Sequence, residues 1–197
     1  MLFDFDGTLT CRDSLGAFLW NAYPIIPRMW RGIRAIPFWL MYQLGARSAD
    51  QAKEAIFGIF FAGWEVERFR KYCEAFAHTS IPSMIRTPVY RILQYHRRRG
   101  DKVWIVSASP EDYLQPWTHA QGVQLIATPI EKKNGRLTGR FAGPNCRGQE
   151  KVRRIRENID LAAYDEIIAY GDSPDDYPMM KLAHQAYYRP FQRIRSG

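Results

Sequence analysis

The sequence predicts an α/β protein in which a parallel sheet is flanked by helices and interrupted by a helical insertion. Residues 1–5 form a short apolar run, which is typical of a buried strand. Residues 13–80 carry helix patterns and no good strand pattern. After residue 88, strand and helix patterns alternate along the chain, and such alternation favours a parallel sheet covered by helices.

The insertion begins with a proline-punctuated helical region. Residues 14–44 contain Pro24, Pro27 and Pro37, and we expect breaks or kinks there because proline removes a backbone donor. Ser48 followed by Gln51 forms the pattern of a capping box, so the next helix should begin there and reach residue 61. Residues 65–77 have apolar side chains at helical spacing.

The alternating part contains four helix patterns, four strand patterns and one hairpin. Ser109 is predicted to cap a helix whose first residue is Pro110. Asn134-Gly135 is a turn signal between two short strands. The predicted helices are 89–99, 110–121, 149–158 and 174–184, the strands are 102–107, 123–127 and 166–170 with a last short one at 186–188, and the hairpin is 130–140.

Composition places the chain among ordinary globular proteins with an unusual charge. Its 197 residues are 46% apolar and 24% charged, which excludes general disorder. The net charge of +8 predicts attraction to an anionic partner such as a phosphorylated substrate, a membrane surface or nucleic acid. The three cysteines are scattered, which predicts a reducing compartment and a cytoplasmic protein. Acidic residues begin at Asp4, so no signal peptide is expected. No uncharged apolar run is long enough to span a membrane.

Two carboxylates follow the first predicted strand. Asp4 and Asp6 stand at positions i and i+2, so they lie on the same side of an extended segment. One carboxylate can attack a substrate while the other handles protons. Gly7 allows a sharp turn that brings backbone N–H groups towards an anion.

Three further segments stand near the ends of other predicted strands or in the loops between them. Ser107 ends a strand, and its hydroxyl with neighbouring N–H groups, including that of Ala108, suits a phosphate oxygen. Lys151 opens a helix and can offset negative charge. Residues 171–176 (GDSPDD) contain three carboxylates at a strand-to-helix turn, which suits Mg²⁺. Ligands bind beyond the carboxyl ends of parallel strands, so these segments are expected to converge on one site.

The combination of DFDGTLT, Ser107, Lys151 and GDSPDDYPMM, in that order, resembles the haloacid dehalogenase-like phosphatases. The order of these motifs along the chain is similar to that in the branch of this family that contains phosphoserine phosphatase. In that branch a helical cap follows the first motif. The resemblance implies a Rossmann-like core over residues 1–12 and 81–197. It implies a helical cap over residues 13–80.

The same resemblance implies roles for individual residues. Asp4 would form an aspartyl-phosphate, and Asp6 would protonate the leaving alcohol and then activate water. Ser107 and Lys151 would hold the phosphoryl group. The Mg²⁺ ligands would be Asp4, the Asp6 carbonyl and Asp172, supported by Asp176.

Two acidic residues have less defined roles. Asp175 stands where close relatives often carry Asn, and it adds negative charge near the metal. Asp13 follows the first motif closely, as an Asp does in the bacterial phosphatidylglycerophosphatase C group, whose insertion is similar in length and pattern. Asp13 and Asp175 are therefore candidates for contact with the substrate.

The insertion leaves the substrate open between two interpretations. Arg28, Arg31 and Arg34 fall near one helix face among many aromatic and apolar residues, so the segment 23–44 fits a membrane interface. The alternative is that its apolar residues pack inside the cap with arginine towards solvent. A lipid phosphate such as phosphatidylglycerophosphate, at the inner membrane face, is the preferred expectation.

Two other functions remain in view. A small phosphoserine-like metabolite is less favoured, because it needs a small polar pocket and the insertion is broad and aromatic-rich. Non-catalytic binding of an anionic surface or of nucleic acid is disfavoured, because basic residues are dispersed and no nucleic-acid-binding motif is present.

Overall fold

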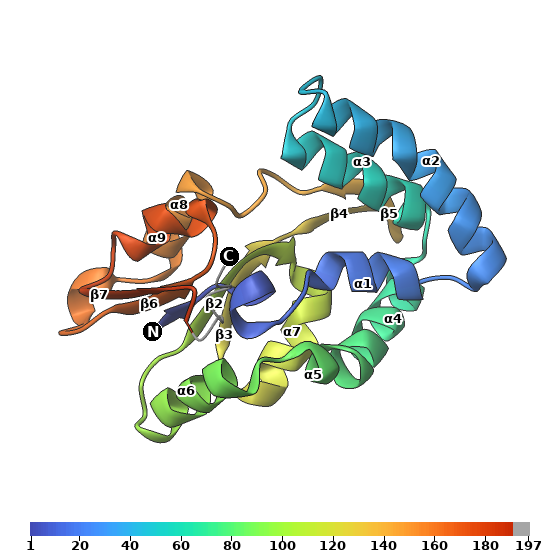
Figure 1. Ribbon diagram of the computed structural model, residues 1–197. Helices are drawn as coiled ribbons and strands as arrows, with labels where there is room; N and C mark the ends of the chain where they lie inside the picture. The colour runs from blue at the N-terminus through green and yellow to red at the C-terminus, as the bar shows by residue number, and fades with distance from the viewer. Residues whose placement is uncertain (191–197) are drawn as a thin grey trace, which may run out of the picture.

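A five-stranded parallel sheet forms the centre of the computed structural model, which describes residues 1–190 (Figure 1). Its order is β3-β2-β1-β6-β7, with every neighbouring pair parallel. The strands are β1 (Leu2–Phe3), β2 (Trp104–Pro110), β3 (Gln124–Thr128), β6 (Ile168–Gly171) and β7 (Gln185–Tyr188). The predicted α/β class with a parallel sheet is confirmed.

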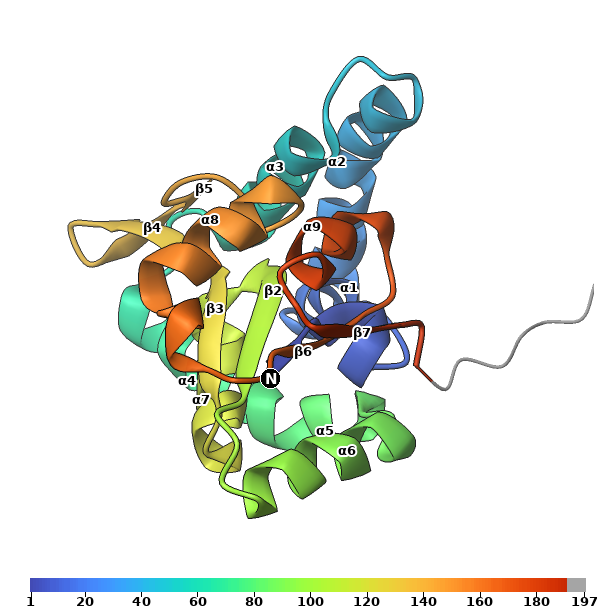
Figure 2. The ribbon, with the colours of Figure 1, turned by 90° about the vertical axis from the view of Figure 1, so that its left-hand side faces the viewer.

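Helices cover both faces of this sheet (Figure 2). Phe3 of β1 packs with residues of α6 (Thr87–Arg98) and α7 (Glu111–Gln121). Leu2, its neighbour, packs with residues of α8 (Gln149–Asn158) and α9 (Tyr177–Met180) on the other face. Successive side chains of a strand point to opposite faces, so both residues of this short central strand are buried.

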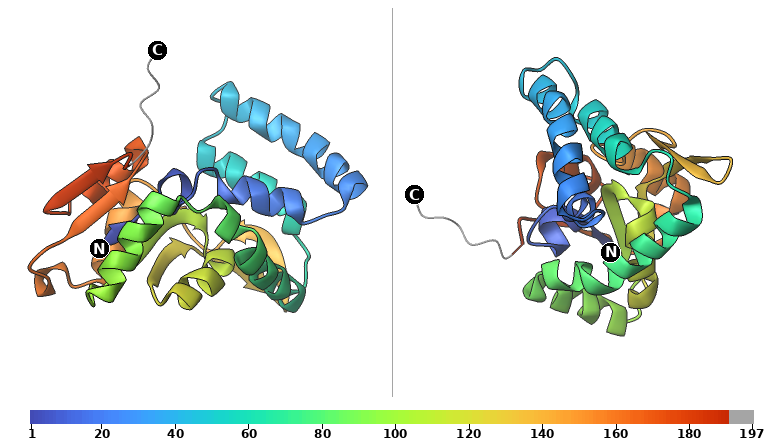
Figure 3. Two further views of the ribbon diagram at one scale, coloured as in Figure 1. Left: turned by 60° about the horizontal axis from the view of Figure 1, so that its bottom comes forward. Right: turned by 90° about the vertical axis from the view of Figure 1, so that its right-hand side faces the viewer.

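The insertion is helical, as predicted (Figure 3). The capping box of Ser48 and Gln51 opens α3, with both reciprocal hydrogen bonds present. The hairpin of β4 (Ile130–Lys133) and β5 (Arg136–Phe141) packs against α3, and the Phe141 N–H donates to the Glu54 carboxylate over 2.8 Å. The inserted helices are α1 (Ser14–Asn21), α2 (Ile25–Gln43), α3 (Ala49–Phe61) and α4 (Val66–Thr79), and the short helix α5 (Ile81–Met84) follows them.

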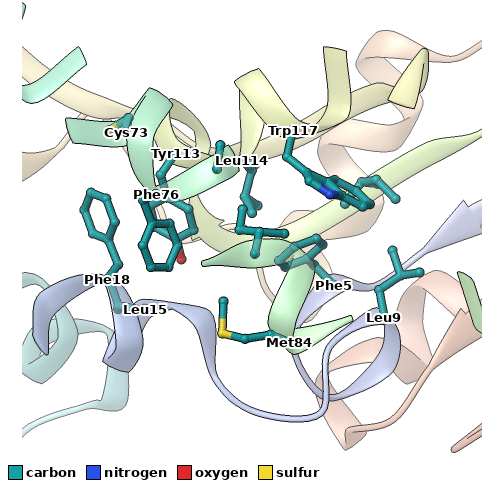
Figure 4. Close-up of a cluster of buried hydrophobic side chains, with 14 of the residues drawn as sticks. Phe5, Leu9, Leu15, Phe18, Cys73, Phe76, Met84, Tyr113, Leu114 and Trp117 are labelled. Carbon is teal, nitrogen blue, oxygen red and sulfur yellow. The ribbon is translucent and has the colours of Figure 1, made fainter. Parts of the chain in front are cut away.

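One aromatic cluster joins the insertion to the sheet-covering helices (Figure 4). Phe18 of α1 is fully buried and stacks on Tyr113 of α7 with ring centroids 4.5 Å apart. It also meets Phe76 of α4 at 5.0 Å and Phe61 of α3 at 5.1 Å. The inserted helices are therefore held on the core by continuous apolar packing.

The sequence predicts breaks or kinks at Pro24, Pro27 and Pro37, and the structure has no break at two of these prolines. The chain does break before α2, where Pro24 is the N-cap, but α2 continues through Pro27 and Pro37. Pro27 lies in the first turn, where backbone N–H groups have no helical partner in any case. Pro37 leaves the carbonyl of exposed Ile33 without its helical donor, and water can satisfy that carbonyl.

Two predicted helix boundaries also need correction. Ser109 does not cap α7, because β2 extends to Pro110 and the Ser109 hydroxyl donates to Asp6 instead. The predicted helix over 174–184 is shorter. A single 3₁₀ turn, Pro174–Asp176, leads into α9, which ends at Met180 so that the chain can turn back and pair β7 with β6.

Helix α2 has no buried residue along its 19 positions. Its half-buried positions include Arg28, Arg31 and Phe38. Its other side, which we call the apolar face of α2, consists of Ile25, Ile26, Met29, Trp30, Ile33, Ile36, Trp39 and Leu40, between 45% and 71% exposed. The expectation that these apolar residues pack inside the insertion is not met. Within residues 1–190, no helix combines the length and apolar character needed to cross a bilayer.

The aromatic cluster leads to a test of what holds the insertion on the core. Phe18→Ala should lower the free energy of unfolding by about 3–5 kcal/mol, because a fully buried ring is replaced by a cavity. Urea unfolding measures this loss. Leu44→Ala is the matched control, since Leu44 is 82% exposed and its removal should cost less than about 0.5 kcal/mol. A Phe18 loss as small as that of the control would contradict this packing.

Candidate active site

The sheet order brings the three strand-end motifs together. Strand β1 lies between β2 and β6, so Asp4 after β1 is flanked by Ser107 of β2 and by the turn after β6. A cavity of about 270 Å³ opens at this edge and is lined by residues that include Asp4, Asp6, Ser107 and Lys151. A larger cavity, of about 600 Å³ between α3 and β5, is lined by none of these residues.

Lys151 is buried between two carboxylates. Its Nζ donates to Asp4 Oδ1 over 2.7 Å and to Asp176 Oδ1 over 2.6 Å. All three side chains are almost inaccessible to solvent, with Lys151 only 2% exposed. A buried charge is stable only when it is paired and hydrogen-bonded, and Lys151 meets both conditions.

Burial and neighbouring charges set the protonation of these groups in opposite directions. Burial raises the pKa of Asp4 to about 7, partly offset by Lys151 and reinforced by Asp176 and Asp6. Burial opposes the charge of Lys151, but the attraction of Asp4 and Asp176 outweighs it and raises the pKa of the ammonium. Burial likewise opposes the charge of Asp176, yet Lys151 and Ser173 lower the pKa of that carboxyl below its usual value.

Asp6 is held by two serines that sequence reasoning did not assign to the site. Asp6 Oδ2 accepts from the Ser109 hydroxyl over 2.5 Å, and Asp6 Oδ1 accepts from the Ser14 N–H over 2.7 Å. Burial raises the pKa of Asp6, with Asp13 adding to the rise and both serines opposing it. Asp6 is therefore oriented and disposed to carry a proton, which a general acid requires.

Three carboxylates can share a cation. One ligand atom from each of Asp4, Asp172 and Asp176 lies within 4.8 Å of the others, so carboxylate oxygens converge as a hard divalent cation requires. Gly7 stands directly against Asp172, where a Cβ would collide with the carboxylate, and its φ of +81° favours glycine. The raised pKa of Asp4 fits the same conclusion, because a bound cation would favour the ionised carboxylate. The residues present fit Mg²⁺.

The remaining predicted residues have distinct surroundings. The Ser107 hydroxyl accepts from the Ser109 N–H over 3.0 Å, and Ala108 lines the cavity beside it. The Gly7 N–H donates to the Thr10 hydroxyl over 3.2 Å, so this donor already has a partner within the loop. Asp13 is exposed and caps α1 by accepting from the Leu15 N–H.

Asp175 and several unpredicted residues line the mouth of the cavity. Asp175 pairs with Arg147 over 2.6 Å, so its charge is matched by an arginine rather than added to the metal cluster. Lys53 of α3, Asn145 and Arg147 also line the cavity. Burial lowers the pKa of Lys53, although Asp6, Asp13 and Asp50 oppose the change. No sequence signal marked Lys53, because it looks like any polar residue of an amphipathic helix.

Comparisons with known proteins show what this chain is similar to. Residues 1–181 match the family described as haloacid dehalogenase-like hydrolase. Protein CicA of Caulobacter vibrioides is 35% identical over 197 residues, which cover 96% of this chain and 85% of that protein. A histidinol-phosphatase of Neisseria meningitidis serogroup C is 26% identical, over 93% of this chain and 86% of that protein.

The fold has solved counterparts as well. A substrate-bound phosphoserine phosphatase matches with a TM-score of 0.65 and 16% identity, over 95% of this chain and 83% of that one. At this identity the likeness shows a shared fold.

The buried triad of Asp4, Lys151 and Asp176 gives a stability test. Lys151→Met should lower the free energy of unfolding by about 3–5 kcal/mol at pH 7 in chelator, because two buried carboxylates lose their counter-charge. The pKa of Asp4 is about 7 in the folded protein against 3.8 for the free group, so the folded state binds its proton more tightly. The contribution of Asp4 to the free energy of unfolding therefore falls as pH rises from about 4 to 7. We expect the loss in the free energy of unfolding of Lys151→Met to be smaller at pH 5 than at pH 7.

Urea unfolding at pH 5 and pH 7 measures both effects. Lys71→Met is the control, because Lys71 is 71% exposed and its ion pair with Glu67 is 4.0 Å long. An equal and small loss for both variants would show that Lys151 is not a required counter-charge.

Proposed function

We propose that this chain, which belongs to the haloacid dehalogenase-like hydrolase family and is a phosphatase, hydrolyses phosphate monoesters through an aspartyl-phosphate formed on Asp4. One observation carries the proposal. A buried carboxylate paired with Lys151 lies two residues from a second carboxylate, Asp6, that is oriented by Ser109 and Ser14. This arrangement provides separate groups for attack and for proton transfer.

In the first step, an Asp4 oxygen attacks phosphorus and the bond from phosphorus to the ester oxygen breaks. The leaving oxygen takes the electron pair and accepts the proton carried by Asp6. Ser107 and the N–H groups near Ala108 hold oxygens of the phosphoryl group. Lys151 keeps Asp4 in position and offsets the charge that gathers beside it.

In the second step, Asp6 acts in reverse. Its carboxylate accepts a proton from a water molecule, and the water oxygen attacks phosphorus of the aspartyl-phosphate. The bond between phosphorus and the Asp4 oxygen breaks, which releases inorganic phosphate and restores the Asp4 carboxylate. The second carboxylate is essential here, because transfer to water needs a proton acceptor.

Mg²⁺ is the proposed cofactor. Asp4, Asp172 and the Asp6 carbonyl would hold it, with Asp176 supporting the cluster while also binding Lys151. When bound, the ion offsets charge on the phosphoryl group and on the Asp4 carboxylate. The Asp176 carboxylate accepts from the backbone N–H groups of Asp172 and Ser173, which fixes the turn that presents Asp172.

The nucleophile is tested by Asp4→Asn. The amide is nearly isosteric but cannot form the acyl phosphate, so turnover of p-nitrophenyl phosphate should fall about a thousandfold or more while the fold is kept. Phosphate release is measured with Mg²⁺ and with excess chelator, and chelation should abolish wild-type turnover. Circular dichroism checks the fold. Activity retained in Asp4→Asn would remove Asp4 from the mechanism.

We further propose that residues 13–80 act as a cap on the core formed by residues 1–12 and 81–197. Helix α3 reaches the cavity through Lys53 and Asp50, and Tyr42 at the end of α2 also lines it. The cap therefore supplies part of the substrate's surroundings. Substrate selection is expected to depend on these residues rather than on the carboxylates of the core.

A lipid phosphate at a membrane surface is the proposed substrate. The apolar face of α2 exposes Trp30 and Trp39 by 66% and 52%, side chains that suit the headgroup region of a bilayer. Residues 14–49 contain four arginines and no acidic residue, which complements anionic lipid. Because Tyr42 links this helix to the cavity, docking α2 on a bilayer would bring lipid headgroups towards Asp4.

A small soluble metabolite is the second candidate. The cavity holds about 270 Å³ and is lined by five carboxylates, two lysines and an arginine, which suits a compact polar substrate. A relative at 26% identity bears the name histidinol-phosphatase. In this case the apolar face of α2 would serve another purpose than substrate access.

The two candidates are separated by comparing vesicles with soluble esters. We expect Mg²⁺-dependent phosphate release from phosphatidylglycerophosphate in anionic vesicles to exceed release from phosphoserine and histidinol phosphate. Replacing Trp30 and Trp39 with serine should weaken vesicle sedimentation at least about tenfold and leave turnover of p-nitrophenyl phosphate unchanged.

Tyr95→Ser is the control for this test, because Tyr95 is 56% exposed on α6 of the core. Hydrolysis of the soluble esters alone would keep the mechanism and discard the lipid substrate. Unchanged sedimentation of the double variant would discard the membrane role of α2.

A further inference from the structure

We propose that Lys53 of α3 binds the phosphate group of the substrate, as a cation supplied to the active site by the cap. This inference rests on the proposed function, because it assumes that phosphate occupies the cavity beside Asp4. Lys53 lines the same cavity as Asp4, Ser107 and Lys151.

The Lys53 ammonium reaches the core at the proposed phosphate-binding segment. Its Nζ donates to the Ala108 carbonyl over 2.6 Å and to Asn145 Oδ1 over 3.2 Å. Ala108 directly follows Ser107, whose hydroxyl is expected to hold a phosphate oxygen, and all three residues line the same cavity. An ammonium has three N–H donors, and these two acceptors leave one for a ligand.

Charge pairing distinguishes Lys53 from the other cations of the cavity. Lys151 forms ion pairs with Asp4 and Asp176, and Arg147 forms them with Asp50 and Asp175. Within residues 1–190, Lys53 has no carboxylate within ion-pair distance, and both of its hydrogen-bond acceptors are neutral oxygens.

Lys53 is half-buried, and Asp6, Asp13 and Asp50 favour its charge only from beyond ion-pair distance. Partial burial of an ammonium without a direct ion-pair partner is costly. The cost is explained when an anionic ligand supplies the counter-charge, and a phosphate group at this site carries up to two negative charges. Lys53 therefore gives the cavity an attraction for phosphate that Lys151 and Arg147, already neutralised, provide less well.

The contacts of Lys53 also dock α3 on the core, so binding must be separated from docking. Asp50, one turn earlier on α3, makes its own contacts with the core. Its carboxylate accepts from Asn145 Nδ2 over 2.7 Å and pairs with Arg147 at 3.4 Å. Asp50→Asn loosens the docking of α3 without removing the Lys53 charge.

The test measures binding of inorganic phosphate by isothermal titration calorimetry in Mg²⁺ buffer. We expect Lys53→Met to raise the dissociation constant at least about tenfold, and Lys53→Arg to stay within about threefold of wild type. Asp50→Asn should not raise the constant, because it removes a negative charge from the lining of the cavity and keeps the charge of Lys53. Lys71→Met, which removes an exposed charge from α4, should leave it unchanged. Thermal melts establish that each variant is folded.

Three results would overturn the proposal. The first is phosphate binding by Lys53→Met that equals binding by wild type. The second is a loss of binding in Asp50→Asn as large as that in Lys53→Met, which would make Lys53 a docking residue only. Absence of saturable phosphate binding in wild type counts against it too. Because this is a binding measurement, it is independent of turnover. A wild-type protein that binds phosphate through Lys53 but hydrolyses no ester would refute the proposed function alone.

Discussion

The ammonium of Lys151, enclosed between Asp4 and Asp176, is the interaction on which the rest of the site depends. It joins the end of β1 to the turn after β6 from α8, so three separate segments are fixed by one side chain. Without that charge, two buried carboxylates would face each other in a poorly solvated space. The triad therefore holds the site together, and Asp4 still lines the cavity.

The site has a centre formed by residues of the core and a border, at the mouth of the cavity, to which the insertion contributes. Asp4, Asp6, Ser107 and Lys151 come from the core, where strand pairing and burial fix them. The border comes from α3 and from the loop before α8, joined by Asp50, Asn145 and Arg147. The proposed chemistry therefore belongs to the core, and the proposed substrate selection belongs to the border.

Helix α2 reverses the usual arrangement of an amphipathic helix. Arg28 and Arg31 are half-buried, with Arg31 over the ring of Tyr23 at 3.8 Å, while isoleucine and tryptophan face outwards. A soluble helix normally buries its apolar side. Exposed apolar area on this scale is characteristic of an interaction surface, and its continuity with Tyr42 places that surface next to the cavity.

Much of the fold and of the candidate site could be predicted from the sequence itself. Local patterns predicted the strand and helix alternation, the capping box at Ser48 and the turn at Asn134-Gly135, because backbone propensities and caps act over a few residues. Asp4, Ser107, Lys151 and Asp176 were recognisable from their order along the chain. Their convergence followed from the rule that parallel strands end at one edge.

Tertiary structure alone decided the roles of Ser109, Lys53 and α2. The sequence pattern predicted that Ser109 caps a helix, but its hydroxyl donates a hydrogen bond to Asp6, which is 103 residues away along the chain. In the sequence, Lys53 resembles any surface lysine, but the packing of α3 on the core places its ammonium in hydrogen-bond contact with the Ala108 carbonyl. The sequence left α2 open between packing and exposure, because a periodic pattern shows that a helix has two sides but not which side meets the protein. Such contacts between distant segments depend on how whole elements pack, and no local pattern encodes them.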